Sequence, residues 1–163
     1  LSLFTRHPHP TTHPRIQAKA VPQPDGGSVY LGSLGVCVVR DVDSLEVWNL
    51  LDGETADLSA LAAPFVTGEI SRLIGSEDDS YRCGVAAVAQ FDLCPCWAGT
   101  PLPGFCLVSA VEQLGSDCDI ALAFRNDAVG VSNHPERLGV LGRCGYVDLG
   151  SGVIGARVRQ PSK

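Results

Sequence analysis

The chain contains no methionine, few aromatic residues and no long apolar run. It opens on Leu1, and because translation begins at methionine, we expect a processed product or an excised fragment. No stretch of about 18 or more apolar residues is present, and no signal-peptide pattern opens the chain. We therefore expect no membrane span.

Positive charge is also scarce, since the chain has 12 basic and 18 acidic residues and a net charge of −6. This balance excludes a global basic surface for nucleic acid or an anionic membrane. The exception is residues 1–27, an expected extended arm with His-Pro repeats, in which residues 1–19 carry basic residues and no acid. We expect a solvated arm, with docking onto an acidic partner or RNA as the alternative.

The rest of the composition predicts a folded core. Apolar residues make up 45% of the chain and charged residues 18%, so we expect residues 28–163 to form a single globular domain. The seven cysteines are an odd number, which makes complete pairing within the chain impossible. A chain of this length folds without disulfides, so the cysteines favour a reducing compartment over secretion. Cys37 and Cys83 lie in apolar, strand-like settings and are predicted to be buried.

Apolar spacing and turn residues predict an α+β fold with short helices in the first half and an antiparallel, β-rich second half. Helices are expected at 43–51, 57–63 and 67–74, with a break at Pro64, and again at 105–114. Strands are expected at 29–39, 81–91, 119–124, 138–141, 146–149 and 152–158, and residues 94–104 are expected to form an ordered loop.

The most informative segment is Gly104-Phe105-Cys106-Leu107-Val108-Ser109-Ala110-Val111, where a loop gives way to the helix predicted at 105–114. A thiol at a helix N-terminus meets unpaired N–H groups and the positive end of the helix dipole. Both favour the thiolate, which is the nucleophilic form of cysteine. The segment therefore predicts a cysteine hydrolase with Cys106 as nucleophile.

This segment resembles the nucleophile segment of papain-like leader proteases of positive-strand RNA viruses, such as those of arteriviruses and hypoviruses. The resemblance implies a virus-encoded cysteine peptidase, released from a polyprotein and acting without a cofactor on protein or peptide substrates in the host cytoplasm. It implies His134 as the base and Asp148 as the residue that orients it. His134 is the only histidine outside the arm, and it follows Cys106 more closely than is usual in the family.

Three alternatives remain open. One is a non-catalytic viral accessory or structural domain that binds a protein partner. Another is a degenerate relative of the viral chymotrypsin-like cysteine proteases, because Gly142-Arg143-Cys144-Gly145 is similar to their Gly-x-Cys-Gly turn, although residues 14–133 contain no histidine for their base. The third is a zinc site built on Cys94 and Cys96, with Cys83, Cys106, Cys144 or His134 as further ligands.

Overall fold

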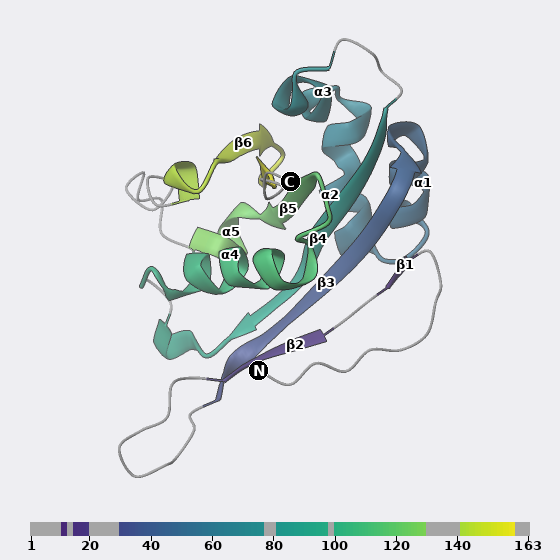
Figure 1. The fold of residues 1–163 in the computed structure, drawn as a ribbon. Helices are drawn as coiled ribbons and strands as arrows, with labels where there is room; N and C mark the ends of the chain where they lie inside the picture. The colour runs from purple at the N-terminus through teal and green to yellow at the C-terminus, as the bar shows by residue number, and fades with distance from the viewer. Residues whose placement is uncertain are drawn as a thin grey trace.

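The computed structural model describes residues 11–12, 15–19, 30–76, 81–97, 100–129 and 141–158. Figure 1 shows two long strands, β3 and β4, running side by side through the molecule. The described elements are β1 (Thr11–Thr12), β2 (Arg15–Lys19), β3 (Tyr30–Asp43), α1 (Ser44–Asp52), α2 (Ala56–Val66), α3 (Glu69–Ile74), β4 (Arg82–Leu93), η1 (Pro95–Trp97), α4 (Leu102–Leu114), β5 (Ile120–Phe124), α5 (Arg125–Val129), β6 (Tyr146–Gly150) and β7 (Val153–Arg157). Residues 141–143 add a helical turn before β6.

The strands form one mixed sheet with the order β1-β3-β4-β5-β7-β6, and β2 also pairs with β3. All described neighbours are antiparallel except β4 and β5, which run parallel. A parallel pair needs a crossover connection, and α4 supplies the helix of that connection. The α+β class is therefore confirmed.

The predicted division into a helical first half and an antiparallel, strand-rich second half is only partly correct. The two longest strands, β3 and β4, precede residue 94, and the longest helix, α4, follows them. The second half also contributes β5 to the parallel pair. Strand direction was missed because it depends on how the chain crosses the sheet, which local apolar spacing does not encode.

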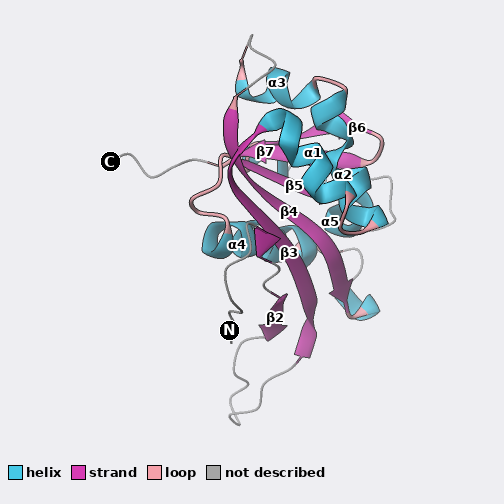
Figure 2. Cartoon of the chain, turned by 90° about the vertical axis from the view of Figure 1, so that its right-hand side faces the viewer, coloured by secondary structure: helices cyan, strands magenta, loops and turns pink. Residues whose placement is uncertain are grey.

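Helices cover both faces of the central sheet, with α4 on one side and α1, α2 and α3 on the other (Figure 2). Successive strand residues point to opposite faces, so Ala121 packs in the cluster under α4 and Leu122 in the cluster under the other three helices. Strands covered on both faces are apolar at every position, as Ile120–Ala123 illustrates. The core is thus two apolar layers separated by the sheet.

Most predicted elements are confirmed, with changed boundaries. The helix predicted at 43–51 is α1, where the Asp43 carboxylate accepts a hydrogen bond from the Leu45 N–H, and the strands predicted at 119–124, 146–149 and 152–158 are β5, β6 and β7. Residues 138–140 of another predicted strand lie outside the described residues, and Leu141 is helical. The helix α5 was not predicted.

Pro64 does not break the second helix, contrary to the sequence prediction. α2 continues through Pro64 to Val66, although proline lacks the N–H that helix bonding uses. Pro64 is buried in the helical layer and lies close to the helix end, where only two helical residues follow it. Burial of the proline ring explains why the helix tolerates it.

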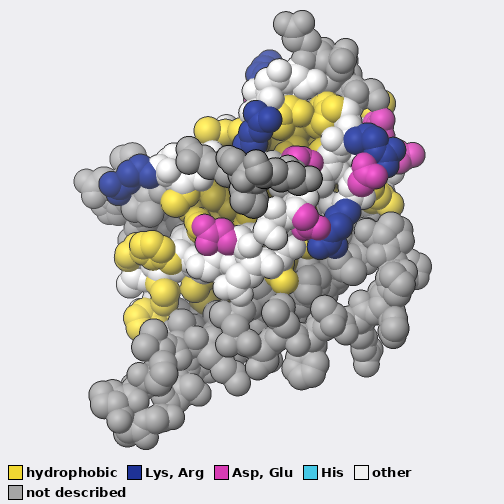
Figure 3. Space-filling view, in the orientation of Figure 1, with side chains coloured by type: hydrophobic (Ala, Val, Ile, Leu, Met, Phe, Trp, Pro, Cys, Tyr) yellow, Lys and Arg dark blue, Asp and Glu magenta, His cyan; other side chains and the backbone are white. Residues whose placement is uncertain are grey.

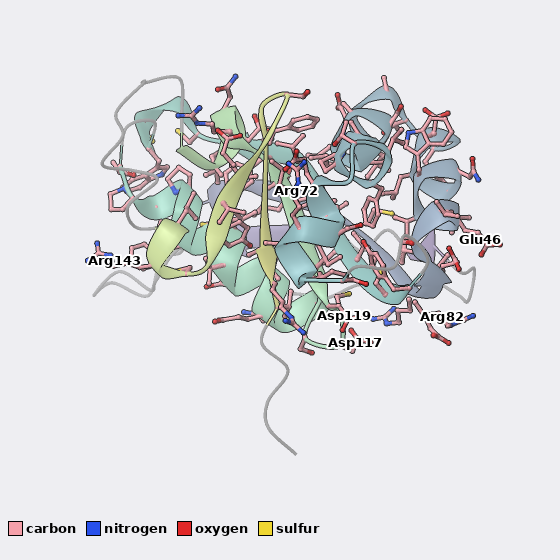
Figure 4. All side chains as sticks on the ribbon, turned by 90° about the horizontal axis from the view of Figure 1, so that it is seen from above. Glu46, Arg72, Arg82, Asp117, Asp119 and Arg143 are labelled. Atoms are coloured by element: carbon pink, nitrogen blue, oxygen red, sulfur yellow. The ribbon has the colours of Figure 1, made fainter. Side chains whose placement is uncertain are left out.

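A polar cluster fixes the amino end of β5. The Gly84 N–H donates to the Asp119 carboxylate at 2.8 Å, and the Asp119 N–H donates to the Gly84 carbonyl, also at 2.8 Å. The neighbouring Asp117 carboxylate pairs with Arg40. Figure 4 shows Asp117 and Asp119 at the same edge of the molecule as Arg82. These acids hold the chain between α4 and β5 in place.

Part of the predicted arm joins the sheet, because β1 and β2 pair with β3. Docking of the arm onto a partner stays a prediction. None of the helices in the described ranges combines the length and apolar character needed to cross a bilayer.

Candidate functional site

The parallel strands β4 and β5 separate at their carboxyl ends. Their pairing runs only from Val85 opposite Ile120 to Val88 opposite Ala123. β5 then ends at Phe124, whereas β4 continues to Leu93 along β3. The crevice outside the carboxyl ends of parallel strands is a frequent ligand-binding position. This separation is the first place in the fold to look for a site.

A β-bulge in β4 lies at the same point. Val88 stands opposite Val36 and Gln90 stands opposite Gly35, so Ala89 is an extra residue in β4. A bulge bends its strand and redirects the side chains around it, and bulges are frequent next to active sites. The bulge therefore helps to turn β4 away from the end of β5.

A cavity of about 420 Å³ opens where the two strands separate. We call it the β4/β5 cavity and define it by its lining residues, which come from α2, β4, β5, α5 and the β6–β7 turn: Asp57, Ala89, Phe124, Asn126, Asp127, Ser151 and Gly152. Residues from five elements, some of them distant in sequence, therefore line one cavity.

The β6–β7 turn contributes Ser151 and Gly152 to this cavity. Both residues have positive φ, 52° and 77°, in a two-residue loop between the paired Gly150 and Val153. Positive φ at both central residues is characteristic of the tight hairpin turn whose twist matches the strands. Glycine adopts this backbone readily, whereas Ser151 is an uncommon residue there. The turn is anchored to the end of β5 by the Arg125 N–H, which donates to the Gly152 carbonyl at 2.8 Å.

Two carboxylates give the cavity its electrostatic character. Asp57 lies in the first turn of α2, and Asp127 lies in α5, half-buried. Burial raises the pKa of the Asp127 carboxyl above its ordinary value, and the negative charge of Asp57 raises it further. The neighbouring cation, Arg125, contacts Asp148 instead, with 3.4 Å between Nη1 and Oδ2. The cavity is therefore a place where positive charge is favoured.

A second cavity, of about 400 Å³, lies among the helices on the same face of the sheet. Its lining is mainly apolar and includes Trp48, Phe65 and Tyr81. Burial raises the pKa of the Tyr81 phenol to about 12, so this hydroxyl stays protonated at neutral pH. The described lining carries no carboxylate or basic side chain. Its described lining therefore offers no charged group to orient a ligand, whereas the β4/β5 cavity offers two carboxylates.

The predicted nucleophile Cys106 lies inside a helix and not at its start. α4 begins at Leu102, three residues before the predicted start at Phe105, and its first turn holds Pro103, which needs no N–H partner there. Cys106 is thus the fifth helical residue and lies beyond the first turn, where backbone N–H groups have no partner within the helix. It is half-buried against the apolar cluster under α4, and burial raises the pKa of its thiol.

We expect iodoacetamide at pH 7 to label Cys106 at least about threefold more slowly than the exposed Cys144, because a raised pKa leaves less thiolate and the side chain is partly covered. Site-resolved mass spectrometry over a time course measures both rates. The buried Cys37, whose pKa burial raises to about 12, provides the slow reference. Preferential labelling of Cys106 would instead support the predicted peptidase.

The other predicted triad residues are in different surroundings. Asp148 is exposed on β6, where it contacts Arg125 and accepts a hydrogen bond from the Gly150 N–H at 2.9 Å. His134 lies outside the described residues. The assignment of Cys106, His134 and Asp148 as a triad therefore stays a prediction.

The cysteines predicted to bind zinc are close together. The sulfurs of Cys94 and Cys96 are 2.8 Å apart, and both side chains are exposed. Within the part of the chain that the structure describes, no three histidine, cysteine or acidic side chains gather as a metal site. Zinc binding by Cys94 and Cys96 stays a prediction.

The other predicted cysteine settings are clear. Cys144 is exposed in the turn before β6, and Figure 4 places its neighbour Arg143 far from Asp119 and Arg82. Cys37 and Cys83 are buried in β3 and β4, as predicted.

On the face of the molecule drawn in Figure 3, acidic and basic side chains are interspersed, and neither sign dominates.

Comparison with known proteins adds no assignment: no protein-family model matches the chain, and neither does any curated protein or solved structure.

Proposed function

We propose that this protein binds a small molecule carrying a positive charge and that the ligand occupies the β4/β5 cavity. The observation that carries the proposal is the presence of two carboxylates, Asp57 and Asp127, in the lining of one cavity. The described lining includes no lysine, arginine or histidine to balance them. A cation is therefore the ligand charge that this cavity favours.

The effect of Asp57 on Asp127 supports the same conclusion. Two like charges at one cavity repel each other, and this repulsion adds to burial in raising the pKa of Asp127. A bound ammonium group reduces the repulsion and compensates the partly buried carboxylate. Binding is expected to be tightest when both carboxylates are ionised.

The remaining lining residues indicate what the ligand's uncharged part is like. A volume of about 420 Å³ lies within the range of about 300–1,000 Å³ common for small-molecule sites. Ala89 and Phe124 supply apolar surface, and an aromatic ring also attracts cations. Asn126 and Ser151 add neutral hydrogen-bonding groups. An alkyl or aryl amine combines these properties.

Benzylammonium tests the proposal, with benzyl alcohol as a neutral probe of similar size. We expect benzylammonium to bind at least about tenfold more tightly than benzyl alcohol, and Asp127→Asn to weaken its binding about tenfold, or about 1.4 kcal/mol. Isothermal titration calorimetry measures the affinities. Shifts of the backbone amide resonances of Phe124 and Asn126 locate the probe.

The matched control is Asp92→Asn, which removes the same charge from an exposed position of β4 outside the cavity lining. Benzylammonium affinity is also expected to fall as the pH is lowered, because protonation neutralises Asp127. The raised pKa of Asp127 makes this loss begin at a higher pH than for an ordinary aspartate. Equal binding of the two probes, or equal effects of the two substitutions, would contradict the proposal.

A further inference from the structure

Cys94 and Cys96 stand apart from the other described cysteines. Their sulfurs are 2.8 Å apart, and both side chains are exposed to solvent. Cys37, Cys83 and Cys118 are buried, and burial raises the pKa of each thiol to about 12. Only the Cys94–Cys96 pair, among the described cysteines, combines two thiols in contact with access to reagents.

The backbone holds this pair in position on both sides. Before it, Leu93 ends β4 opposite Gly32 of β3. After it, the Trp97 N–H donates to the Cys94 carbonyl at 3.0 Å, closing the turn of η1. The Thr100 hydroxyl donates to the Trp97 carbonyl at 2.8 Å and accepts from the Leu102 N–H at 3.3 Å, which links the turn to α4. The two sulfurs are thus brought together by the fold around them.

We propose that Cys94 and Cys96 form a reversible disulfide by exchange with a small disulfide such as oxidised glutathione. A disulfide has a sulfur–sulfur bond of about 2.05 Å, so closing the present 2.8 Å separation needs a shift of under about 1 Å. The site is distinct from the β4/β5 cavity, whose described lining residues include no cysteine. The inference therefore does not depend on the proposed ligand.

The contact between the thiols leaves the order of attack open to both cysteines. Either sulfur can donate to the other, so the thiolate that attacks first can form at Cys94 or at Cys96.

The exchange balances in two steps. The thiolate of one cysteine attacks one sulfur of oxidised glutathione, which breaks the glutathione disulfide and releases one glutathione thiolate. The thiol of the other cysteine then loses its proton, and its sulfur attacks the cysteine Sγ in the mixed disulfide, releasing the second glutathione. The protein dithiol is oxidised by two electrons, and one glutathione disulfide is reduced to two glutathione molecules. Excess reduced glutathione reverses both steps.

The test incubates the full-length protein anaerobically in buffers of reduced and oxidised glutathione. Samples are quenched with acid and free thiols are blocked, and the disulfides are left unreduced, so that peptide masses distinguish an internal disulfide from glutathione adducts. Chymotryptic cleavage after Leu93 and Trp97 isolates the peptide that carries both cysteines. We expect this peptide to contain an internal disulfide in oxidising buffer.

Three variants make the result decisive. Cys96→Ser is expected to stop the reaction at a glutathione adduct on Cys94, and Cys94→Ser is expected to stop it at an adduct on Cys96. Cys144→Ser removes an exposed thiol elsewhere and is expected to leave the internal disulfide unchanged. Glutathione adducts on both Cys94 and Cys96 of the wild-type protein, without an internal disulfide in the most oxidising buffer, would overturn the proposal. So would two unmodified thiols under those conditions.

Discussion

Replacing Leu122 with alanine is expected to lower the free energy of unfolding by about 3–5 kcal/mol, within the usual range for a buried leucine. Leu122 is fully buried in β5, which lies between β4 and β7. Its neighbours across the sheet are Ala87 and Gly155, which are small. A methyl group at Gly155 would already lie 3.1 Å from Leu122 Cδ2. Leucine therefore occupies space that neither neighbour fills.

Urea denaturation of wild type and Leu122→Ala measures the loss. Because the neighbouring side chains are too short to close the gap, most of the lost contact should remain as a cavity. Val147→Ala on β6 is the matched control, since Val147 is 46% exposed and its truncation is expected to cost less than about 0.5 kcal/mol. A cost below about 1 kcal/mol for Leu122→Ala would contradict the described packing.

Replacing Gly115 with alanine is expected to destabilise the protein by about 1–3 kcal/mol, the cost of forcing an extra carbon into a packed core. Gly115 follows the last residue of α4, and its N–H donates to the Val111 carbonyl at 2.7 Å. A methyl group there would lie 2.7 Å from the Ala86 Cβ and 3.1 Å from the Val111 oxygen. Neither atom belongs to the flexible end of a side chain, so the helix end has to move away from β4.

The matched control for this prediction is Gly142→Ala. Gly142 lies in the helical turn before β6, and among the described residues no atom beyond those of its chain neighbours and its own helix lies within 4 Å of a methyl group built on it. Alanine restricts the unfolded chain more than glycine does, so this variant is expected to be neutral or to gain up to about 1 kcal/mol. Thermal and urea unfolding compare the two variants. Equal stability changes at positions 115 and 142 would show that steric contact with β4 is not decisive.

Elements that are marked by a pattern of apolar residues over a few neighbouring positions were predictable from the sequence. The helix predicted at 43–51 from its apolar spacing is α1, and Val47 and Leu51 lie on its buried side. The short strands β6 and β7 follow from apolar runs separated by glycine. The continuation of α2 through Pro64 was not predictable, because burial of the proline ring against the helical layer outweighs a local signal for a helix break.

The candidate site was much harder to predict. Asp127 follows a correctly predicted strand by only three residues, and Asp57 begins a correctly predicted helix. Each position has an ordinary explanation as a polar residue at the end of an element. What joins them is the separation of β4 from β5 and the bulge at Ala89, and both arise from pairing between distant segments. The residues around Cys106 predicted a nucleophile at a helix N-terminus. Cys106 instead lies in the second turn of α4 and packs against apolar side chains.

The sequence by itself determined most of the helical and extended segments, that Cys37 and Cys83 are buried, and that Cys94 and Cys96 are separated by a single proline. These properties depend on neighbouring residues and on apolar content, which act over a few positions along the chain. Only the tertiary structure decided that β4 and β5 run parallel, that Asp57 and Asp127 line one cavity, and that Cys106 is half-buried. Those properties depend on contacts between segments far apart in sequence, where burial and nearby charge change what a side chain can do.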